Sequence, residues 1–140
     1  MTMVTEGVKG KVLVAEDDSQ LRQVICQLLE KQGFTIVGEA GDGTEAVAIA
    51  GDREPDVVLM DIRMPNMDGI EASRRIRAFH PLVQIVVLSA YDDPGLHQGA
   101  QDVGAYCVLV KGCPPAIIDD MITRACEFRR ELERKQITSN

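Results

Sequence analysis

The sequence has no long apolar run and no excess of positive charge. Each absence narrows the class of protein to which the chain can belong. No apolar stretch approaches the roughly 18 residues that a membrane-spanning helix needs, and residues 1–11 lack the apolar centre of a signal peptide. A formal net charge of −7 over 140 residues argues against direct nucleic-acid binding by this segment. We therefore expect a cytoplasmic protein that contacts neither membrane nor nucleic acid.

Cysteine and histidine are too scattered to indicate a disulfide framework or a transition-metal site. The four cysteines form no Cys-x-x-Cys pair and fit no zinc spacing. We expect them to be small core residues in a reducing compartment. His80 and His97 each stand alone, which disfavours a metal-ligand role. The chain also lacks a glycine-rich phosphate-binding loop, which disfavours nucleotide hydrolysis.

What the sequence does contain is a fivefold alternation of strand-like and helix-like segments. The apolar runs are residues 11–15, 34–37, 57–60, 85–88 and 107–110, and the helical patterns are residues 21–29, 42–49, 69–79, 92–103 and 114–132. This order predicts an α/β fold, a doubly wound parallel sheet with right-handed crossovers and helices on both faces. Residues 92–103 should form the least stable helix, because Gly95 and Gly99 each cost about 1 kcal/mol relative to alanine.

The stretch from Pro55 to Gly69 organises the rest of the chain. Its run of four apolar residues indicates a strand buried on both faces, in the middle of the sheet. Asp61 ends this run, at the sheet edge where open α/β sheets bind ligands. A carboxylate here could simply cap a turn. Capping-box signals at Asp42 and Asp68, each with a glutamate three residues on, open the helices on either side of this strand.

Three other strands also end in polar residues, and together they predict a phosphoryl-transfer site. Glu16 and Asp17 follow the first strand, Ser89 the fourth and Lys111 the fifth. Clustered carboxylates favour a hard divalent cation such as Mg²⁺, which would keep Asp61 ionised and nucleophilic. Lys111 and Ser89 offer a charge and a hydrogen bond to an incoming phosphoryl group.

Four ordered motifs resemble the receiver (CheY-like) domain of bacterial two-component response regulators. They are residues 12–19, 56–69, 86–90 and 108–111, and the resemblance covers roughly residues 10–130. It implies a flavodoxin-like (βα)5 fold with strand order 2-1-3-4-5. It also implies that Asp61 accepts a phosphoryl group from a sensor histidine kinase and that the domain is a signalling phosphoprotein, not an enzyme beyond self-phosphotransfer and autodephosphorylation.

The resemblance also assigns the remaining site residues. Asp17 and Asp61 would bind Mg²⁺ together with the backbone carbonyl of Arg63, and Glu16 would assist through water. Ser89 would be the switch hydroxyl and Lys111 the partner of the acyl phosphate.

The resemblance further implies how the domain signals. Phosphorylation would switch the surface formed by the last strand and its two flanking helices, and so control an output domain, a downstream protein or a homodimer. The stretch from Val37 to Gly43 and the two prolines after Lys111 look most like receivers of the NarL/FixJ group. We expect a flexible lead-in at residues 1–10, the receiver domain at 11–128 and a charged helical extension at 129–140.

Two departures from the family pattern leave a second reading open. Val108 stands where the family usually has an aromatic switch residue, and Gly112 stands where proline or aspartate is common. Tyr91, two residues past Ser89, is the nearest aromatic that could report or gate the switch, with Tyr106 second. A phosphorylation-independent interaction module is therefore the alternative. A hydrolase of the aspartyl-phosphate type is disfavoured, because Arg63 stands where a second acid would be needed.

Overall fold

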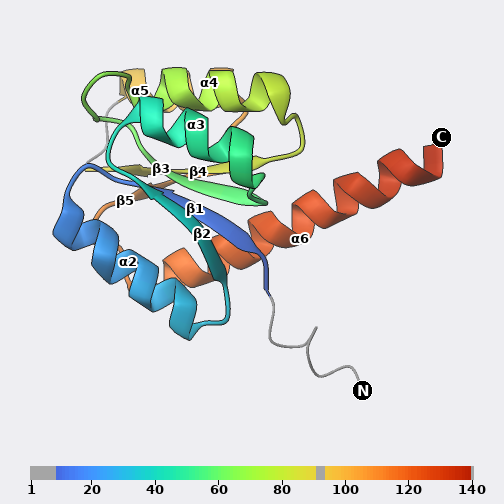
Figure 1. Ribbon diagram of the computed structural model, residues 1–140, viewed down its shortest axis with the longest axis horizontal. Coiled ribbons are helices and arrows are strands. Elements are labelled where there is room, and N and C mark those ends of the chain that lie inside the picture. Colours follow the sequence, from blue (N-terminus) through green and yellow to red (C-terminus); the bar gives the residue numbers. More distant parts are fainter. Residues whose placement is uncertain (1–8, 91–93, 140) are drawn as a thin grey trace.

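A five-stranded parallel sheet lies between two layers of helices in the computed structural model, which describes residues 9–90 and 94–139 (Figure 1). The strands are β1 (Lys11–Ala15), β2 (Thr35–Ala40), β3 (Val57–Asp61), β4 (Gln84–Ser89) and β5 (Cys107–Val110). The helices are α2 (Ser19–Lys31), α3 (Gly43–Arg53), α4 (Gly69–Phe79), α5 (Pro94–Asp102) and α6 (Pro115–Ser139). The sheet order is β2-β1-β3-β4-β5 and every pairing is parallel, which confirms the predicted fold.

The two faces of the sheet bury separate apolar clusters, because successive side chains of each strand point to opposite faces. α2 and α6 cover one face, and α3, α4 and α5 cover the other (Figure 1). In β3, Val57 and Leu59 face α2 and α6, whereas Val58 and Met60 face the other layer. All four side chains are buried, which confirms β3 as the two-sided central strand.

Aspartate caps begin three of the helices, and each accepts hydrogen bonds from backbone amides of the first turn. Asp18 begins α2 by accepting from the amides of Gln20 and Leu21 at 3.0 and 3.2 Å. Asp42 begins α3 and Asp68 begins α4, each by accepting from the amide three residues later at 2.8 and 2.9 Å. The caps predicted at Asp42 and Asp68 are confirmed.

The structure places a few apolar residues differently from the predicted pattern. Val24 belongs to the predicted apolar stripe of α2 but is 60% exposed, whereas Cys26 is buried in the cluster that α2 shares with α6. Phe79, at the end of α4, is 45% exposed. β2 continues to Ala40, beyond the predicted residues 34–37, because it pairs with β1 as far as Ala15 after a register shift between Val12 and Leu13.

The cysteines are all free thiols. Cys26 and Cys126 lie in the core as expected, whereas Cys107 and Cys113 are half-buried beside it. Burial raises the pKa of Cys126 to about 12, so this thiol is unreactive at neutral pH.

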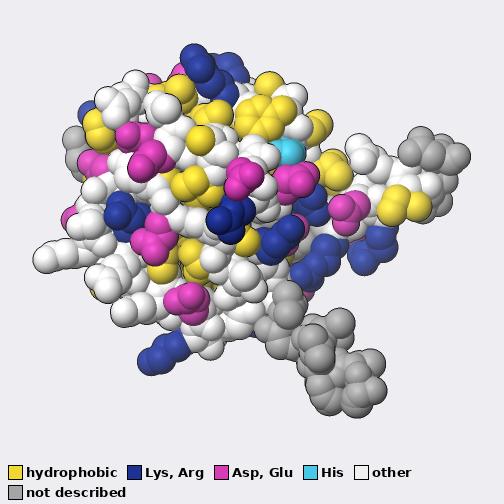
Figure 2. Space-filling model, viewed as in Figure 1, with side chains coloured by type: hydrophobic (Ala, Val, Ile, Leu, Met, Phe, Trp, Pro, Cys, Tyr) yellow, Lys and Arg dark blue, Asp and Glu magenta, His cyan; other side chains and the backbone are white. Residues whose placement is uncertain are grey.

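α6 extends well past the sheet (Figure 1). Ion pairs and hydrogen bonds anchor the helix at the point where it leaves the rest of the domain. Figure 2 shows acidic and basic side chains mixed around this base of the projecting helix. Arg129 Nη1 lies 3.3 Å from Asp56 Oδ1, and Asp56 Oδ2 accepts the amide of Lys11 at 2.8 Å.

α6 runs without a break through the predicted domain boundary at residue 128, which stays a prediction. Most of the predicted lead-in, residues 1–8, lies outside the described residues. We find no helix among the described residues with the length and apolar character that a bilayer crossing requires.

Candidate functional site

Three carboxylates meet at the carboxyl edge of the sheet. Glu16 and Asp17 follow β1, Asp61 ends β3, and each offers a carboxylate oxygen within 4.8 Å of the others. Glu16 and Asp61 are only 1% and 3% exposed, whereas Asp17 faces solvent. Neighbouring parallel strands bring their carboxyl ends together, so the strand order β1-β3 creates this cluster from residues 44 positions apart. We call Glu16, Asp17 and Asp61 the acidic cluster.

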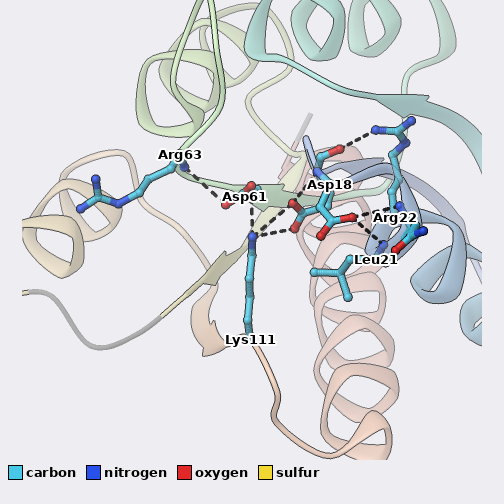
Figure 3. Close-up of polar contacts among 8 residues, drawn as sticks. Asp18, Leu21, Arg22, Asp61, Arg63 and Lys111 are labelled. Carbon is cyan, nitrogen blue, oxygen red and sulfur yellow. Dashed lines mark hydrogen bonds and ion pairs between the residues drawn. The ribbon is translucent and has the colours of Figure 1, made fainter.

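Lys111 supplies the positive charge that faces the acidic cluster. It follows β5, and its side chain reaches back past β4 toward Asp61 (Figure 3). Lys111 Nζ lies 2.9 Å from Glu16 Oε1 and 3.3 Å from Asp61 Oδ2. Its backbone amide donates to the carbonyl of Ser89 at 2.6 Å, which ties the ends of β4 and β5 together.

Arg22 holds the backbone on the other side of the acidic cluster, and sequence reasoning missed this residue. Arg22 Nη1 donates to the carbonyl oxygen of Glu16 at 2.6 Å (Figure 3). Its Nε lies 3.2 Å from Glu39 Oε1. The amide of Asp18 also donates to Glu16 Oε2, at 3.0 Å. A usable signal was present, because a helix dipole disfavours a cation in the first turn. Arg22 in the first turn of α2 therefore needs a specific acceptor.

The electrostatics of the cluster put its proton on Asp61. Burial, followed by the neighbouring carboxylates of Glu16 and Asp17, raises the pKa of Asp61 to about 7, and the charge of Lys111 opposes this shift. Burial also acts to raise the pKa of Asp17, but contacts with the other two acids and the charge of Lys111 outweigh it, so the pKa of Asp17 is lowered. The pKa of Lys111 is raised: burial acts to lower it, and the two acids beneath it prevail.

The donor set of the acidic cluster fits a hard divalent cation. Glu16 Oε1 and Asp61 Oδ2 are buried and accept no hydrogen bond, and among the described residues the Lys111 ammonium is the cation that lies against both of them. Three ionised carboxylates against one ammonium would leave uncompensated negative charge in a buried place, which is costly. Mg²⁺ takes oxygen ligands and is usually held by one or two carboxylates, so the residues present suit it.

A small pocket of about 40 Å³ opens beside Asp61. Its lining is Asp61, Ile62, Arg63, Ser89, Ala90, Leu96 and Lys111. Ser89 is buried at the end of β4, and the amide of Arg63 donates to Asp61 Oδ1 at 3.3 Å. The structure thus brings all six residues singled out from the sequence to one edge of the sheet.

The residues considered for the switch do not join this pocket within the described part of the chain. Tyr91 lies outside the described residues. Val108 is half-buried and packs with the layer of α3, α4 and α5, on the opposite face of the sheet from Tyr106. Tyr106 packs against Phe128 of α6, with ring centroids 5.6 Å apart. Neither Val108 nor Tyr106 therefore lines the pocket beside Asp61.

A 2-1-3-4-5 parallel sheet with acids after β1 and β3 and a lysine after β5 is the architecture of a CheY-like signalling domain. The response regulator receiver domain family matches residues 12–123, and the chain belongs to this family. The family inferred from the motifs is thus confirmed.

The chain matches different shares of its curated relatives. The chain is 44% identical over 115 residues to the transcriptional regulatory protein PdtaR of Mycobacterium tuberculosis strain H37Rv, covering 82% of this chain and 54% of PdtaR. It is 32% identical over 114 residues to the chemotaxis protein CheY of Thermotoga maritima, covering 81% of this chain and 95% of CheY. The chain therefore spans about half the length of the first relative and nearly all of the second.

Solved structures agree with this assignment. The signal receiver domain of NarL from Mycobacterium tuberculosis superposes with a TM-score of 0.80 at 28% identity, covering 84% of this chain and 96% of that one. A CheY-like receiver from Methanospirillum hungatei gives a TM-score of 0.82 at 19% identity, with 86% of this chain and 96% of that chain covered, and it supports the fold alone.

Proposed function

We propose that this receiver domain accepts a phosphoryl group on Asp61 from a sensor histidine kinase, in a Mg²⁺-dependent reaction of two-component signalling. One observation carries the proposal: Asp61 belongs both to the acidic cluster and to the pocket that Ser89 and Lys111 line. A carboxylate in that position can meet a cation on one side and a phosphoryl group on the other.

In the proposed reaction, a carboxylate oxygen of Asp61 attacks the phosphorus of a phosphohistidine. The oxygen–phosphorus bond forms, the nitrogen–phosphorus bond breaks, and its electron pair returns to the imidazole of the kinase. The attacking oxygen must be ionised, yet Asp61 holds a proton near neutral pH because its pKa is raised to about 7. Asp17, Asp61 and the Arg63 carbonyl would hold Mg²⁺, with Glu16 acting through water, and the bound ion would supply positive charge that favours the ionised form of Asp61.

Lys111 and Ser89 would receive the transferred group. Lys111 Nζ already lies 3.3 Å from Asp61 Oδ2, so a small movement would bring its ammonium to a phosphoryl oxygen. Ser89 lines the same pocket and would donate its hydroxyl to another phosphoryl oxygen. Hydrolysis of the acyl phosphate by water would then reset Asp61, and we propose no other catalytic activity.

The signal would leave through α5, β5 and α6, because Leu96 of α5 lines the pocket and Lys111 lies in the segment that joins β5 to α6. We propose that this surface then controls an output domain, a downstream protein or a homodimer in the cytoplasm. The alternative, an interaction module that works without phosphate, is favoured by one observation: Val108 offers no ring to turn toward the site.

Phosphate incorporation tests the proposal directly. The wild-type protein, incubated with acetyl phosphate or a kinase and Mg²⁺, should gain acid-labile phosphate, and Asp61→Asn should gain none because an amide is not a nucleophile. Asp52→Asn, at an exposed carboxylate of α3, is the matched control and should label like the wild type. Labelling of Asp61→Asn would remove Asp61 from its role, and an unlabelled wild type would favour the alternative.

A further inference from the structure

The loop between β3 and α4 carries Arg63, whose carbonyl we propose as a cation ligand. This loop contains no strand or helix that would fix its backbone. Asn66 lies in the left-handed region at φ 68°, and the amide of Met67 donates to the carbonyl of Pro65 at 2.7 Å. A loop of this kind keeps a defined backbone only if the surrounding structure holds it.

The side chain of Asp42, the residue just before α3, makes the first contact that holds this loop. Asp42 Oδ1 accepts the amide of Glu45 at 2.8 Å and so begins α3, while Asp42 Oδ2 accepts Asn66 Nδ2 at 2.7 Å. The two bonds use different oxygens, so capping α3 does not depend on Asn66. The same two partners, the Glu45 amide first and Asn66 second, lower the pKa of Asp42, so the acceptor is an ionised carboxylate at neutral pH.

The backbone of α3 makes a second contact with the same loop. The amide of Gly43 donates to the carbonyl of Met67 at 3.1 Å. A Cβ at Gly43 would lie 2.1 Å from that carbonyl oxygen, so the close approach requires glycine. At the far end of the loop, the amide of Gly69 donates to the carbonyl of Ile62 at 2.8 Å. The loop is thus held at the start of α3 as well as at the start of α4.

We propose that Asp42 and Asn66 are positioning residues for the Asp61 site. Their hydrogen bond holds the loop that carries the Arg63 carbonyl, and it thereby sets how tightly the site binds Mg²⁺. This inference rests on the proposed function. Contacts behind the ligands of a metal site orient those ligands, and losing one typically costs about 10- to 100-fold in metal affinity or activity.

Two substitutions of Asp42 separate this role from capping. Asp42→Ser keeps an N-cap side chain but is too short to reach Asn66. Asp42→Asn keeps the cap through its carbonyl oxygen, and its amide group can donate to Asn66 once the Asn66 amide has turned over. The two variants therefore differ in the loop contact and share the cap. Asn66→Gly removes the same hydrogen bond from the other side while still accepting a positive φ.

The readout is the Mg²⁺ concentration that gives half the maximal rate of phosphorylation from acetyl phosphate. We expect it to rise by about 10-fold in Asp42→Ser and in Asn66→Gly, and by less than about 3-fold in Asp42→Asn. The double variant Asp42→Ser/Asn66→Gly should be no worse than either single one, because both remove one shared contact. Asp52→Ser makes the same change at the other end of α3 and should have no effect.

Amide exchange of the Mg²⁺-free protein gives a second readout that does not depend on phosphorylation. Residues 63–67 should exchange faster in Asp42→Ser than in Asp42→Asn, with α3 itself unchanged in both. Unaltered exchange in Asp42→Ser, or an unaltered Mg²⁺ requirement, would overturn the positioning role. Equal losses in the two Asp42 variants would overturn it too, because they would point to the charge and not to the contact. If the wild type takes up no phosphate, the proposed function fails, while exchange still decides whether Asp42 holds the loop.

Discussion

Burial of Asp61 should make the metal-free protein lose stability as the pH rises, and Asp61→Asn should abolish that loss. The pKa of Asp61 is about 7 in the folded protein against 3.8 for the free side chain. Between these values the folded state keeps a proton that the unfolded state has released. Stability falls with rising pH wherever the folded state binds more protons. The contribution of Asp61 is therefore fully present below pH 3.8 and is lost as the pH rises toward 7.

The size of the effect follows from the shift. A difference of roughly three pKa units corresponds to about 4 kcal/mol at about 1.4 kcal/mol per unit, and this is an upper limit because neighbouring acids share the proton. Asparagine has the size of aspartate but no charge. We expect Asp61→Asn to match the wild type within about 1 kcal/mol at pH 4 and to exceed it by about 2–4 kcal/mol at pH 8.

Urea unfolding in EDTA at several pH values, followed by circular dichroism, measures this difference. Asp52→Asn is the control, because it removes an exposed carboxylate of the same kind. Adding Mg²⁺ at pH 8 should narrow the gap, since a cation at 100 times its dissociation constant stabilises the folded state by about 2.7 kcal/mol. A gap that is absent at pH 8, or that does not change with pH, would refute the reasoning.

Three further predictions concern the metal, the backbone and the switch. Mg²⁺ should raise the unfolding temperature of the wild type, and Asp17→Ala should lose most of that rise; an equal rise in the variant would contradict the ligand set. Gly69→Ala should cost about 1–3 kcal/mol or more in urea unfolding, because its Cβ would lie 2.0 Å from the carbonyl oxygen that ends β3. Gly51→Ala, whose Cβ would meet nothing closer than 3.7 Å, should be neutral or stabilising, and equal losses would refute this account. Beryllofluoride with Mg²⁺ should alter amide exchange mainly in residues 89–104, because the last strand has no ring to turn inward; changes confined to residues 107–111 would contradict this route.

The local pattern of the sequence was enough to predict the strands and helices and most of the residues of the candidate site. The apolar run of β3 and the capping residues Asp42 and Asp68 depend on neighbours within a few positions, so they can be recognised in a single sequence. Parallel strands of an α/β sheet present their carboxyl ends at one edge, so Asp61 and Lys111 could be brought together from their places after strands alone.

Contacts between elements that are distant in the sequence could not be predicted from the local pattern. Val24 continues the period of α2 but is exposed, because α2 turns Cys26 toward the cluster that it shares with α6. The position of Arg22 in the first turn of α2 signalled that it needs a specific acceptor, but only the folded structure identifies that acceptor as the backbone carbonyl of Glu16. The pKa of Asp61 was also out of reach, because it depends on the burial of its side chain and on the carboxylates of Glu16 and Asp17 beside it.

The sequence by itself therefore determined the alternation of strands and helices, the edge on which the functional residues meet and the family to which the chain belongs. These depend on periodicity, caps and motif order, which are local properties. The tertiary structure alone decided that Asp42, besides capping α3, also holds Asn66, 24 positions later, at 2.7 Å. It also decided that Asp61 keeps its proton near neutral pH. Both depend on packing and desolvation between distant segments, which exist only once the chain has folded.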